Sequence, residues 1–113
     1  AIIIGAGAIG LLHLCLLLLK GINVLVIDKN SQRLDIANKI GADTILVTNN
    51  DLKKLVYNYK KSIVYDLVVE CTGQLEVWQQ SIDLVRKGGI VILFGGCKPD
   101  TFVKYSTLRI HYD

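Results

Sequence analysis

The chain has 113 residues, of which 51% are hydrophobic and 20% are charged. This length allows one domain with a single core, and the balance excludes intrinsic disorder, because a disordered segment buries too little apolar surface to offset its chain entropy. The net charge of +3 comes from 13 Lys and Arg residues spread between Lys20 and Arg109, so the charge pattern gives little support to nucleic-acid binding.

The first 19 residues, AIIIGAGAIGLLHLCLLLL, nearly reach the length of a membrane-spanning helix. Gly5, Gly7 and Gly10 lie within six positions, a spacing that loosens a helix and suits a tight turn. No basic region precedes the stretch and no cleavage site is evident, which disfavours a signal peptide. We therefore predict a strand over 1–4, a turn and a helix over 9–19, with no membrane partner.

Further short apolar runs follow that are rich in Val, Ile and Leu and do not alternate with polar residues. This pattern is typical of strands buried on both faces of a parallel sheet. The runs lie at 24–27, 44–47, 67–69 and 90–94.

Helical spacing of apolar residues separates these runs. One helix is predicted around Leu34 to Ile40, with Asn30 or Ser31 as its N-cap and Gly41 at its end. A weaker one is predicted near 51–59, capped by Asn50 or Asn49. A fourth helix has its apolar face on residues 75, 78, 82 and 85 and is predicted to end at Gly88-Gly89.

Alternating strands and helices predict an α/β fold, a Rossmann-type doubly wound parallel sheet in three layers, as one domain over residues 1–113. The helix over 9–19 is apolar nearly all round, which a surface helix does not need. We expect a second domain or a subunit contact to cover it, and the alternative is an apolar surface helix that the protein tolerates. The chain opens within an apolar run and contains no Met, so we expect it to be an excerpt of a longer protein.

The segment Gly5-Ala6-Gly7-Ala8-Ile9-Gly10 is a GxGxxG motif between the first strand and the first helix. We assign the tight turn to Gly5, the close approach of a pyrophosphate to Gly7, and close packing of helix on strand to Gly10. Free backbone N–H groups near Ala8 and Ile9 would bind the phosphates. A glycine turn that serves packing only is the alternative.

Asp28 ends the second strand, 18 positions after Gly10, close to the spacing of about 20 expected for an acid that binds ribose. A carboxylate there accepts from the adenosine ribose hydroxyls and repels a 2′-phosphate, so NAD is favoured over NADP. Lys29 would partly offset that repulsion, or else is a solvated lysine. Arg33 either stacks on the adenine or is an exposed helix arginine.

Ligands of open α/β sheets lie beyond the carboxyl ends of the strands. Two more loops are placed there: Cys71-Thr72-Gly73 and Gly95-Gly96-Cys97. We expect both to border the same site, and the alternative for each alone is an ordinary loop.

No other constellation indicates chemistry. Cys15, Cys71 and Cys97 do not have the spacing of a zinc site and are too few for a disulfide framework, which favours a reducing, cytoplasmic location. We assign no acid or base: His13 and His111 have no identifiable partner, and Asp66 and Glu70 lie too far apart along a strand for a catalytic pair. The basic and aromatic residues between 53 and 61 are interpreted as a solvated helix face.

The whole chain resembles the nucleotide-binding domain of zinc-dependent medium-chain alcohol and polyol dehydrogenases. The resemblance is carried by IIIGAGAIGLLHL, VIDKNSQRLDIANKIGAD, DLVVECTG and LVRKGGIVILFGG, in the order and spacing of that family. It implies the same roles for the glycine turn, Asp28 and Arg33, and it places the 71–73 loop and Gly95-Gly96 toward the nicotinamide. Residues 106–113 are similar to the sorbitol and threonine dehydrogenase branch.

The resemblance also implies what lies outside the chain. In this family the catalytic zinc, with its Cys, His and Glu ligands, belongs to a separate domain, and a sixth strand expected after Asp113 helps to join two subunits. We therefore expect the chain alone to bind NAD and to turn over no alcohol, and the full enzyme to oxidise a secondary alcohol or polyol as a homo-oligomer. The alternatives are a nucleotide-sensing regulatory domain of a potassium transporter and a methyltransferase.

Overall fold

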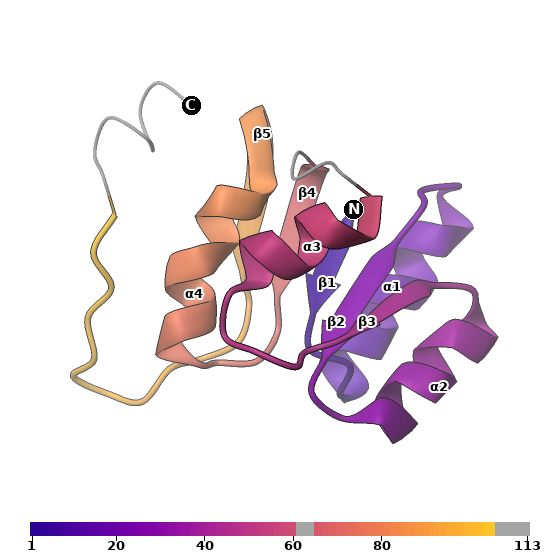
Figure 1. The fold of residues 1–113 in the computed structure, drawn as a ribbon, viewed down its shortest axis with the longest axis horizontal. Helices are drawn as coiled ribbons and strands as arrows, with labels where there is room; N and C mark the ends of the chain where they lie inside the picture. Colours follow the sequence, from indigo (N-terminus) through magenta and orange to yellow (C-terminus); the bar gives the residue numbers. More distant parts are fainter. Residues whose placement is uncertain (61–64, 106–113) are drawn as a thin grey trace.

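Five parallel strands form one sheet in the computed structural model, which describes residues 1–60 and 65–105. Their order across the sheet is β3-β2-β1-β4-β5 (Figure 1). This order is that of the first five strands of a doubly wound dinucleotide-binding sheet, so the predicted Rossmann-type fold is confirmed. The strands are β1 (Ile2–Ile4), β2 (Leu25–Asp28), β3 (Asp43–Leu46), β4 (Tyr65–Glu70) and β5 (Val85–Leu93).

Helices cover both faces of the sheet and complete the predicted three layers (Figure 1). On one face, α1 (Ala8–Leu19) and α2 (Ser31–Ile40) share a buried apolar cluster with Ile3, Val26 and Val69. On the other face, α3 (Leu52–Lys60) and α4 (Leu75–Ser81) pack on a cluster that contains Ile2 and Ile27. Neighbouring residues of one strand thus enter opposite clusters, which explains why the strands show no polar alternation.

The apolar stretch at the beginning of the chain folds as predicted. All of β1 is buried, and α1 is 12 residues long and buries Gly10, Leu14 and Leu17 against the sheet. Within residues 1–60 and 65–105, no helix is both long enough and apolar enough to cross a membrane. The high hydropathy of this stretch therefore reflects a buried strand followed by a helix.

The ends of α2 match the prediction. The Asn30 side chain accepts hydrogen bonds from the backbone N–H groups of Gln32 (2.9 Å) and Arg33 (3.1 Å), as an N-cap does. Gly41 follows the helix with φ of 131°, a conformation that favours glycine.

The predicted cap of α3 is wrong by one or two positions. Asp51, and neither Asn49 nor Asn50, lies before the helix and accepts from the N–H of Lys54 at 3.1 Å. Asn49 instead accepts from the N–H of Asp51 at 2.8 Å, so it shapes the turn before the helix. An acidic side chain at this position is also favoured by the helix dipole.

The fourth helix ends earlier than predicted. α4 stops at Ser81, a 3-10 turn covers Ile82–Leu84, and Val85 already pairs with Tyr65 of β4. The prediction is wrong because the apolar spacing continues through a buried turn: Leu84 is fully buried in the core without being α-helical. Gly88-Gly89 consequently lies within β5.

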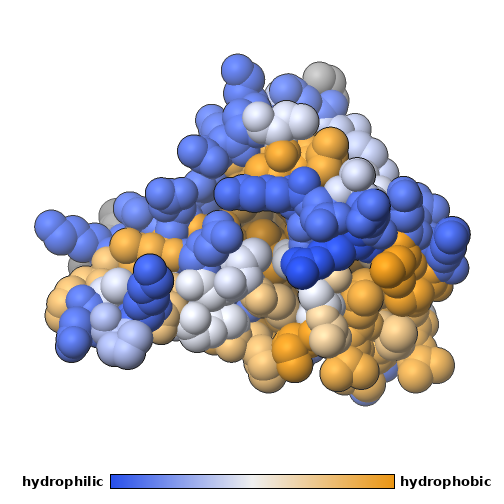
Figure 2. Space-filling model, turned by 90° about the horizontal axis from the view of Figure 1, so that it is seen from below, coloured by the Kyte–Doolittle hydropathy of each residue, from blue (hydrophilic) through white to orange (hydrophobic). Residues whose placement is uncertain are grey.

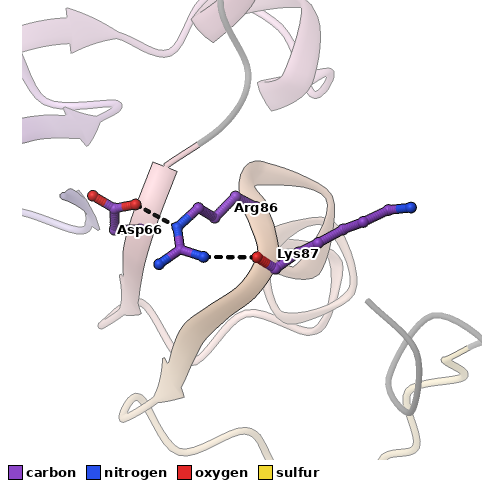
Figure 3. Close-up of polar contacts among 3 residues, drawn as sticks. All are labelled: Asp66, Arg86 and Lys87. Atoms are coloured by element: carbon purple, nitrogen blue, oxygen red, sulfur yellow. Dashed lines mark hydrogen bonds and ion pairs between the residues drawn. The ribbon is translucent and has the colours of Figure 1, made fainter.

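A bulge in β5 accounts for that glycine pair. The ladder steps from Tyr65 opposite Val85 to Leu67 opposite Ile90, so the four residues 86–89 lie opposite the single residue Asp66. A Cβ on Gly89 would lie 2.5 Å from the Val85 side chain, so only glycine fits. In the bulge, the Arg86 guanidinium donates to the Asp66 carboxylate and to the Lys87 carbonyl oxygen (Figure 3).

Residues 94–105 run along the outer side of α4 without regular structure (Figure 1). Two bonds attach this segment to the helix: the Trp78 indole N–H donates to the Gly95 carbonyl (2.8 Å), and the Tyr105 hydroxyl donates to the Trp78 carbonyl (2.6 Å). Pro99, Asp100 and Thr101 lie in a loop, as their residue types predict. His111 and the rest of 106–113 lie outside the described residues.

Candidate functional site

A cleft of about 370 Å³ opens at the edge of the sheet where the parallel strands end. It lies between the ends of β1, β2 and β4, at the point where the crossover helices change faces, which is where open α/β sheets bind ligands. Figure 2 views this edge and shows apolar side chains between hydrophilic ones at its centre. The lining residues are Ile4, Gly5, Gly7, Ile27, Asp28, Lys29, Asn30, Arg33, Val47, Asn50, Leu52, Cys71, Thr72, Gln74, Glu76, Val77 and Gln80.

The glycine turn has the geometry that its motif predicts. Gly5 has φ of 107° and makes the sharp turn out of β1. A Cβ on Gly10 would lie 1.9 Å from the Gly5 carbonyl oxygen, so helix and turn approach as closely as backbone allows. A Cβ on Gly7 would meet no atom of residues 1–60 or 65–105 within 4 Å, so these residues leave the space above Gly7 open.

The start of α1 presents backbone donors toward the open space above Gly7. The first N–H groups of a helix have no partner within it, and no side chain in the described part of the chain caps the Gly7 end of α1. No acidic residue occupies the first turn either. The uncompensated N–H groups and the positive end of the helix dipole therefore favour an anionic ligand.

Asp28 contacts the glycine turn directly. Its Oδ2 accepts from the N–H of Ala6 at 2.6 Å, and its Oδ1 accepts from the N–H of Asn30 at 2.7 Å. Each carboxylate oxygen has a further lone pair, and Asp28 lines the cleft. Asp28 therefore holds the glycine turn against the end of β2 and keeps acceptor capacity for a ligand.

The three predicted loops meet at one place. A Cβ on Gly5 would lie 3.1 Å from the Thr72 methyl group and 3.2 Å from the Cys71 carbonyl carbon. On the other side of that loop, a Cβ on Gly73 would lie 2.4 Å from the Gly96 carbonyl oxygen. The loop after β4 thus lies between the glycine turn and the loop after β5, so the three loops adjoin at the carboxyl edge of the sheet. That both loops border a ligand site stays a prediction.

Glu70, the last residue of β4, is fully buried below this loop. Its Oε1 accepts from the backbone N–H groups of Thr72 (2.6 Å) and Gly73 (3.1 Å) and from the Thr72 hydroxyl. Its Oε2 is buried and has no hydrogen-bond partner among the residues that the structure describes. The carboxylate therefore fixes the loop after β4, much as Asp28 fixes the glycine turn.

Comparison with known proteins identifies the family. The sequence profile described as "Zinc-binding dehydrogenase" matches residues 8–112, nearly the whole chain. The chain belongs to the zinc-binding dehydrogenase family. This zinc-binding dehydrogenase chain is 33% identical to D-altritol 5-dehydrogenase of Agrobacterium fabrum over 111 residues, 97% of the chain and 31% of that relative. It is 32% identical to sorbitol dehydrogenase of Gallus gallus over 95 residues, 80% of the chain and 27% of that relative.

Solved structures of zinc-binding dehydrogenases have the same fold. One from Sinorhizobium meliloti, described as bound to NADP, superposes with a TM-score of 0.88 at 27% identity, over 96% of this chain and 33% of that one. The alcohol dehydrogenase TADH from Thermus sp. ATN1 gives 0.84 at 26% identity, over 96% and 32%. The chain thus spans about a third of the length of these relatives. None of these matches supports the potassium-transporter alternative.

The predicted site residues of this zinc-binding dehydrogenase chain fall into two groups. Those that line the cleft are Gly5, Gly7, Asp28, Lys29, Arg33, Cys71 and Thr72. Those that do not line it are Ala8, Ile9, Gly10, Gly73, Gly95 and Gly96. Gly10 is buried under the turn, and Gly73, Gly95 and Gly96 set the packing of the loops behind the cleft.

Sequence reasoning missed the polar rim and the buried acid. Asn30, Asn50, Gln74, Glu76 and Gln80 line the cleft but lie on helices and turns, where a polar residue has no distinctive pattern. Glu70 did have a signal: like Asp28, it is an acidic residue that ends an apolar strand at the carboxyl edge.

Other candidate groups lie apart from the cleft. The His13 ring contacts the Phe94 ring edge-on at 5.0 Å between centroids, which is a packing contact. Asp66 is exposed and forms an ion pair with Arg86, whereas Glu70 is buried. Asp66 and Glu70 therefore form no carboxyl pair. Among residues 1–60 and 65–105, no three His, Cys, Asp or Glu side chains gather as a metal site would require. The described residues therefore do not fit a zinc ion.

Cys71 is expected to react slowly although it lines the cleft. Burial, followed by the nearby Glu70 charge, raises the pKa of its thiol to about 11, so the reactive thiolate is scarce at pH 8. Cys15 is exposed on α1. Iodoacetamide at pH 8, followed by peptide mass spectrometry, should label Cys15 well before Cys71. Faster labelling of Cys71 in the folded protein would contradict this assignment.

Proposed function

We propose that this chain is the NAD-binding domain of a zinc-dependent dehydrogenase that moves hydride between a secondary alcohol or polyol and the nicotinamide ring. The family membership and the polyol dehydrogenases among the relatives support the reaction class. The observation that carries the proposal is the convergence at one cleft of three features. They are the uncapped start of α1, the open space above Gly7, and the Asp28 carboxylate.

We propose that a dinucleotide binds in the cleft with its two halves in a defined order. The pyrophosphate would contact the backbone N–H groups at the start of α1, above Gly7. The hydroxyl groups of the adenosine ribose would donate hydrogen bonds to the Asp28 carboxylate. Arg33 and Asn50 would lie on the adenine side. The nicotinamide half would then extend toward Thr72, on the β4 side of the cleft.

Asp28 also bears on the choice between NAD and NADP. The neighbour from Sinorhizobium meliloti is described as bound to NADP. In this chain both Asp28 oxygens are acceptors beside the proposed ribose, so a 2′-phosphate would meet like charge. Lys29 and Arg33 line the same cleft and reduce that repulsion without removing the carboxylate. We therefore propose a preference for NAD.

The proposed chemistry divides between this chain and the remainder of the enzyme. NAD supplies the hydride acceptor when bound. The residues of this chain bind and orient the dinucleotide, and we assign none of them to proton transfer. The zinc ligands would come from a separate catalytic domain, so we expect the chain alone to bind NADH without oxidising alcohols.

An exposed apolar face supports the proposed second domain. On α1, Leu12, Leu16 and Leu19 are exposed. On the same side of the sheet, Ile90 of β5 and Phe94, which directly follows that strand, are exposed. Figure 2 shows exposed apolar side chains along its lower border. A face of this kind is typical of a surface that another domain or subunit covers. We propose that the full protein is a homo-oligomer, and the three free thiols support a cytoplasmic location.

Titration of the purified protein with NADH, NADPH and S-adenosylmethionine, followed by nucleotide fluorescence or calorimetry, tests the proposal. NADH should bind with the lowest Kd, NADPH more weakly and S-adenosylmethionine not at all. Preferential binding of S-adenosylmethionine would favour the methyltransferase alternative. Alcohol oxidation by the 113-residue chain alone would contradict the proposed division of the chemistry.

A further inference from the structure

Glu70 has no role in the proposed contacts with NAD, yet it is fully buried at the carboxyl edge of the sheet. Burying a carboxylate is costly unless hydrogen bonds compensate it, and here only one of its two oxygens has partners among the described residues. A residue of this kind is a poor choice for packing alone. The hydrogen bonds of Glu70 therefore indicate what else this residue does.

The bonds of Glu70 fix the orientation of the Thr72 hydroxyl. That hydroxyl donates its single proton to Glu70 Oε1, and it accepts from the N–H of Gln74 at 3.1 Å. A hydroxyl has one proton and two lone pairs, so one lone pair is left. Thr72 lines the cleft, and this remaining lone pair is the only hydrogen-bonding capacity that its side chain retains for a ligand.

The loop that carries Thr72 has little freedom to turn the hydroxyl elsewhere. The Thr72 methyl group packs 3.1 Å from where a Cβ on Gly5 would lie, against the glycine turn. Behind the loop, a Cβ on Gly95 would lie 2.3 Å from the Gly73 nitrogen. The backbone N–H groups of Thr72 and Gly73 are both bonded to Glu70. The hydroxyl, the methyl group and the backbone are thus fixed together.

We propose that Glu70 is a positioning residue that makes the Thr72 hydroxyl an obligate acceptor in the cleft, selecting a hydrogen-bond donor on the nicotinamide half of the cofactor. That donor is a ribose hydroxyl or the carboxamide N–H₂, both of which have the required chemistry. The inference rests on the proposed function, because it needs the dinucleotide to extend from Asp28 toward Thr72. If Glu70 only stabilised the fold, its replacement would not affect the nicotinamide half of the cofactor more than the adenosine half.

The experiment compares Kd values for NADH and AMP in the purified protein. AMP carries only the adenosine half of NADH, so it reports the Asp28 side of the cleft. Thr72→Val keeps the shape of the side chain and removes the hydroxyl, and Thr72→Ser is the matched control that retains it. Glu70→Gln replaces the charged acceptor of the Thr72 hydroxyl with a weaker, neutral one. The Glu70→Gln/Thr72→Val double variant tests whether Glu70 acts through Thr72.

Thr72→Val should weaken NADH binding about three- to tenfold, the net effect of one hydrogen bond, and leave AMP binding unchanged. Thr72→Ser should retain most of the NADH affinity. Glu70→Gln should weaken the binding of NADH but not of AMP. The double variant should bind NADH no more weakly than Thr72→Val, because Glu70 acts through the Thr72 hydroxyl, which Thr72→Val already removes. If Glu70→Gln does not fold, the two Thr72 variants still decide the acceptor role.

Equal losses for NADH and AMP, or none for either in Thr72→Val, would overturn the inference. Additive losses in the double variant would overturn the role of Glu70 through Thr72. If the wild-type protein binds neither NADH nor AMP, the proposed function itself fails. Failure of the proposed function can be distinguished from failure of this inference, because the wild-type protein alone reveals it.

Discussion

Replacing Gly10 with Ala is expected to destabilise the fold by about 3 kcal/mol. The new Cβ would lie 1.9 Å from the Gly5 carbonyl oxygen, a backbone atom that cannot move unless β1 and α1 separate. Ile3 lies directly beneath, 3.5 Å from the same position, so the strain reaches the core. Thermal or urea unfolding of the two proteins measures the effect.

Gly7→Ala is the matched control in the same turn. Gly7 has φ of −76°, which any residue adopts, and a Cβ there would meet none of the residues that the structure describes within 4 Å. The stability of this variant should therefore lie within about 0.5 kcal/mol of the wild type. Its methyl group would occupy the space proposed for the pyrophosphate, so NADH affinity should fall at least about tenfold. Equal losses of stability in Gly10→Ala and Gly7→Ala, or unchanged NADH affinity in Gly7→Ala, would contradict the roles given to these glycines.

Asp28→Ala should weaken NADH binding by about 10- to 100-fold, because hydrogen bonds to a charged group contribute about 1.5–3 kcal/mol. The same change removes the acceptor that holds the Ala6 N–H at 2.6 Å, so the glycine turn loses support as well. NADPH should lose much less affinity, because the repulsion of its 2′-phosphate disappears together with the carboxylate. The ratio of the two Kd values measures the change.

Asp28→Asn separates the two contributions of Asp28. The amide retains an oxygen acceptor and the shape of the side chain but loses the negative charge. The discrimination against NADPH should therefore fall in Asp28→Asn, with a smaller loss of NADH affinity than in Asp28→Ala. If both variants bind both cofactors as the wild type does, Asp28 is not part of the ribose site.

The parts of the site that follow backbone rules could be predicted from the sequence. The glycine turn is constrained by sterics at Gly5 and Gly10, so the glycine spacing, together with its place between a strand and a helix, predicted it. Asp28 could be predicted because a carboxylate at the end of a parallel strand necessarily lies at the ligand edge. The same topological rule correctly placed the loop after β4 beside the turn and the loop after β5 beside the loop after β4.

The features that depend on tertiary contacts could not be predicted in this way. α4 ends at Ser81 because Leu84 enters the core through a turn and Val85 joins the sheet, which helical spacing does not distinguish from a longer helix. The N–H of Leu52 at the start of α3 bonds to the Gln80 side chain, 28 residues away, a contact with no local signal. The position of Glu70 at the end of an apolar strand had a sequence signal, but its hydrogen bonds to Thr72 and Gly73 depend on the loop that folds over it.

The central claim is that a dinucleotide binds with its phosphates at the start of α1 and its adenosine ribose on Asp28. A crystal structure of the protein with NADH tests it most directly. We expect the pyrophosphate oxygens within hydrogen-bond distance of the backbone N–H groups at Gly7 to Ile9, and a ribose hydroxyl on the Asp28 carboxylate. NADH bound at another surface while this cleft stays empty at saturating concentration would contradict the claim.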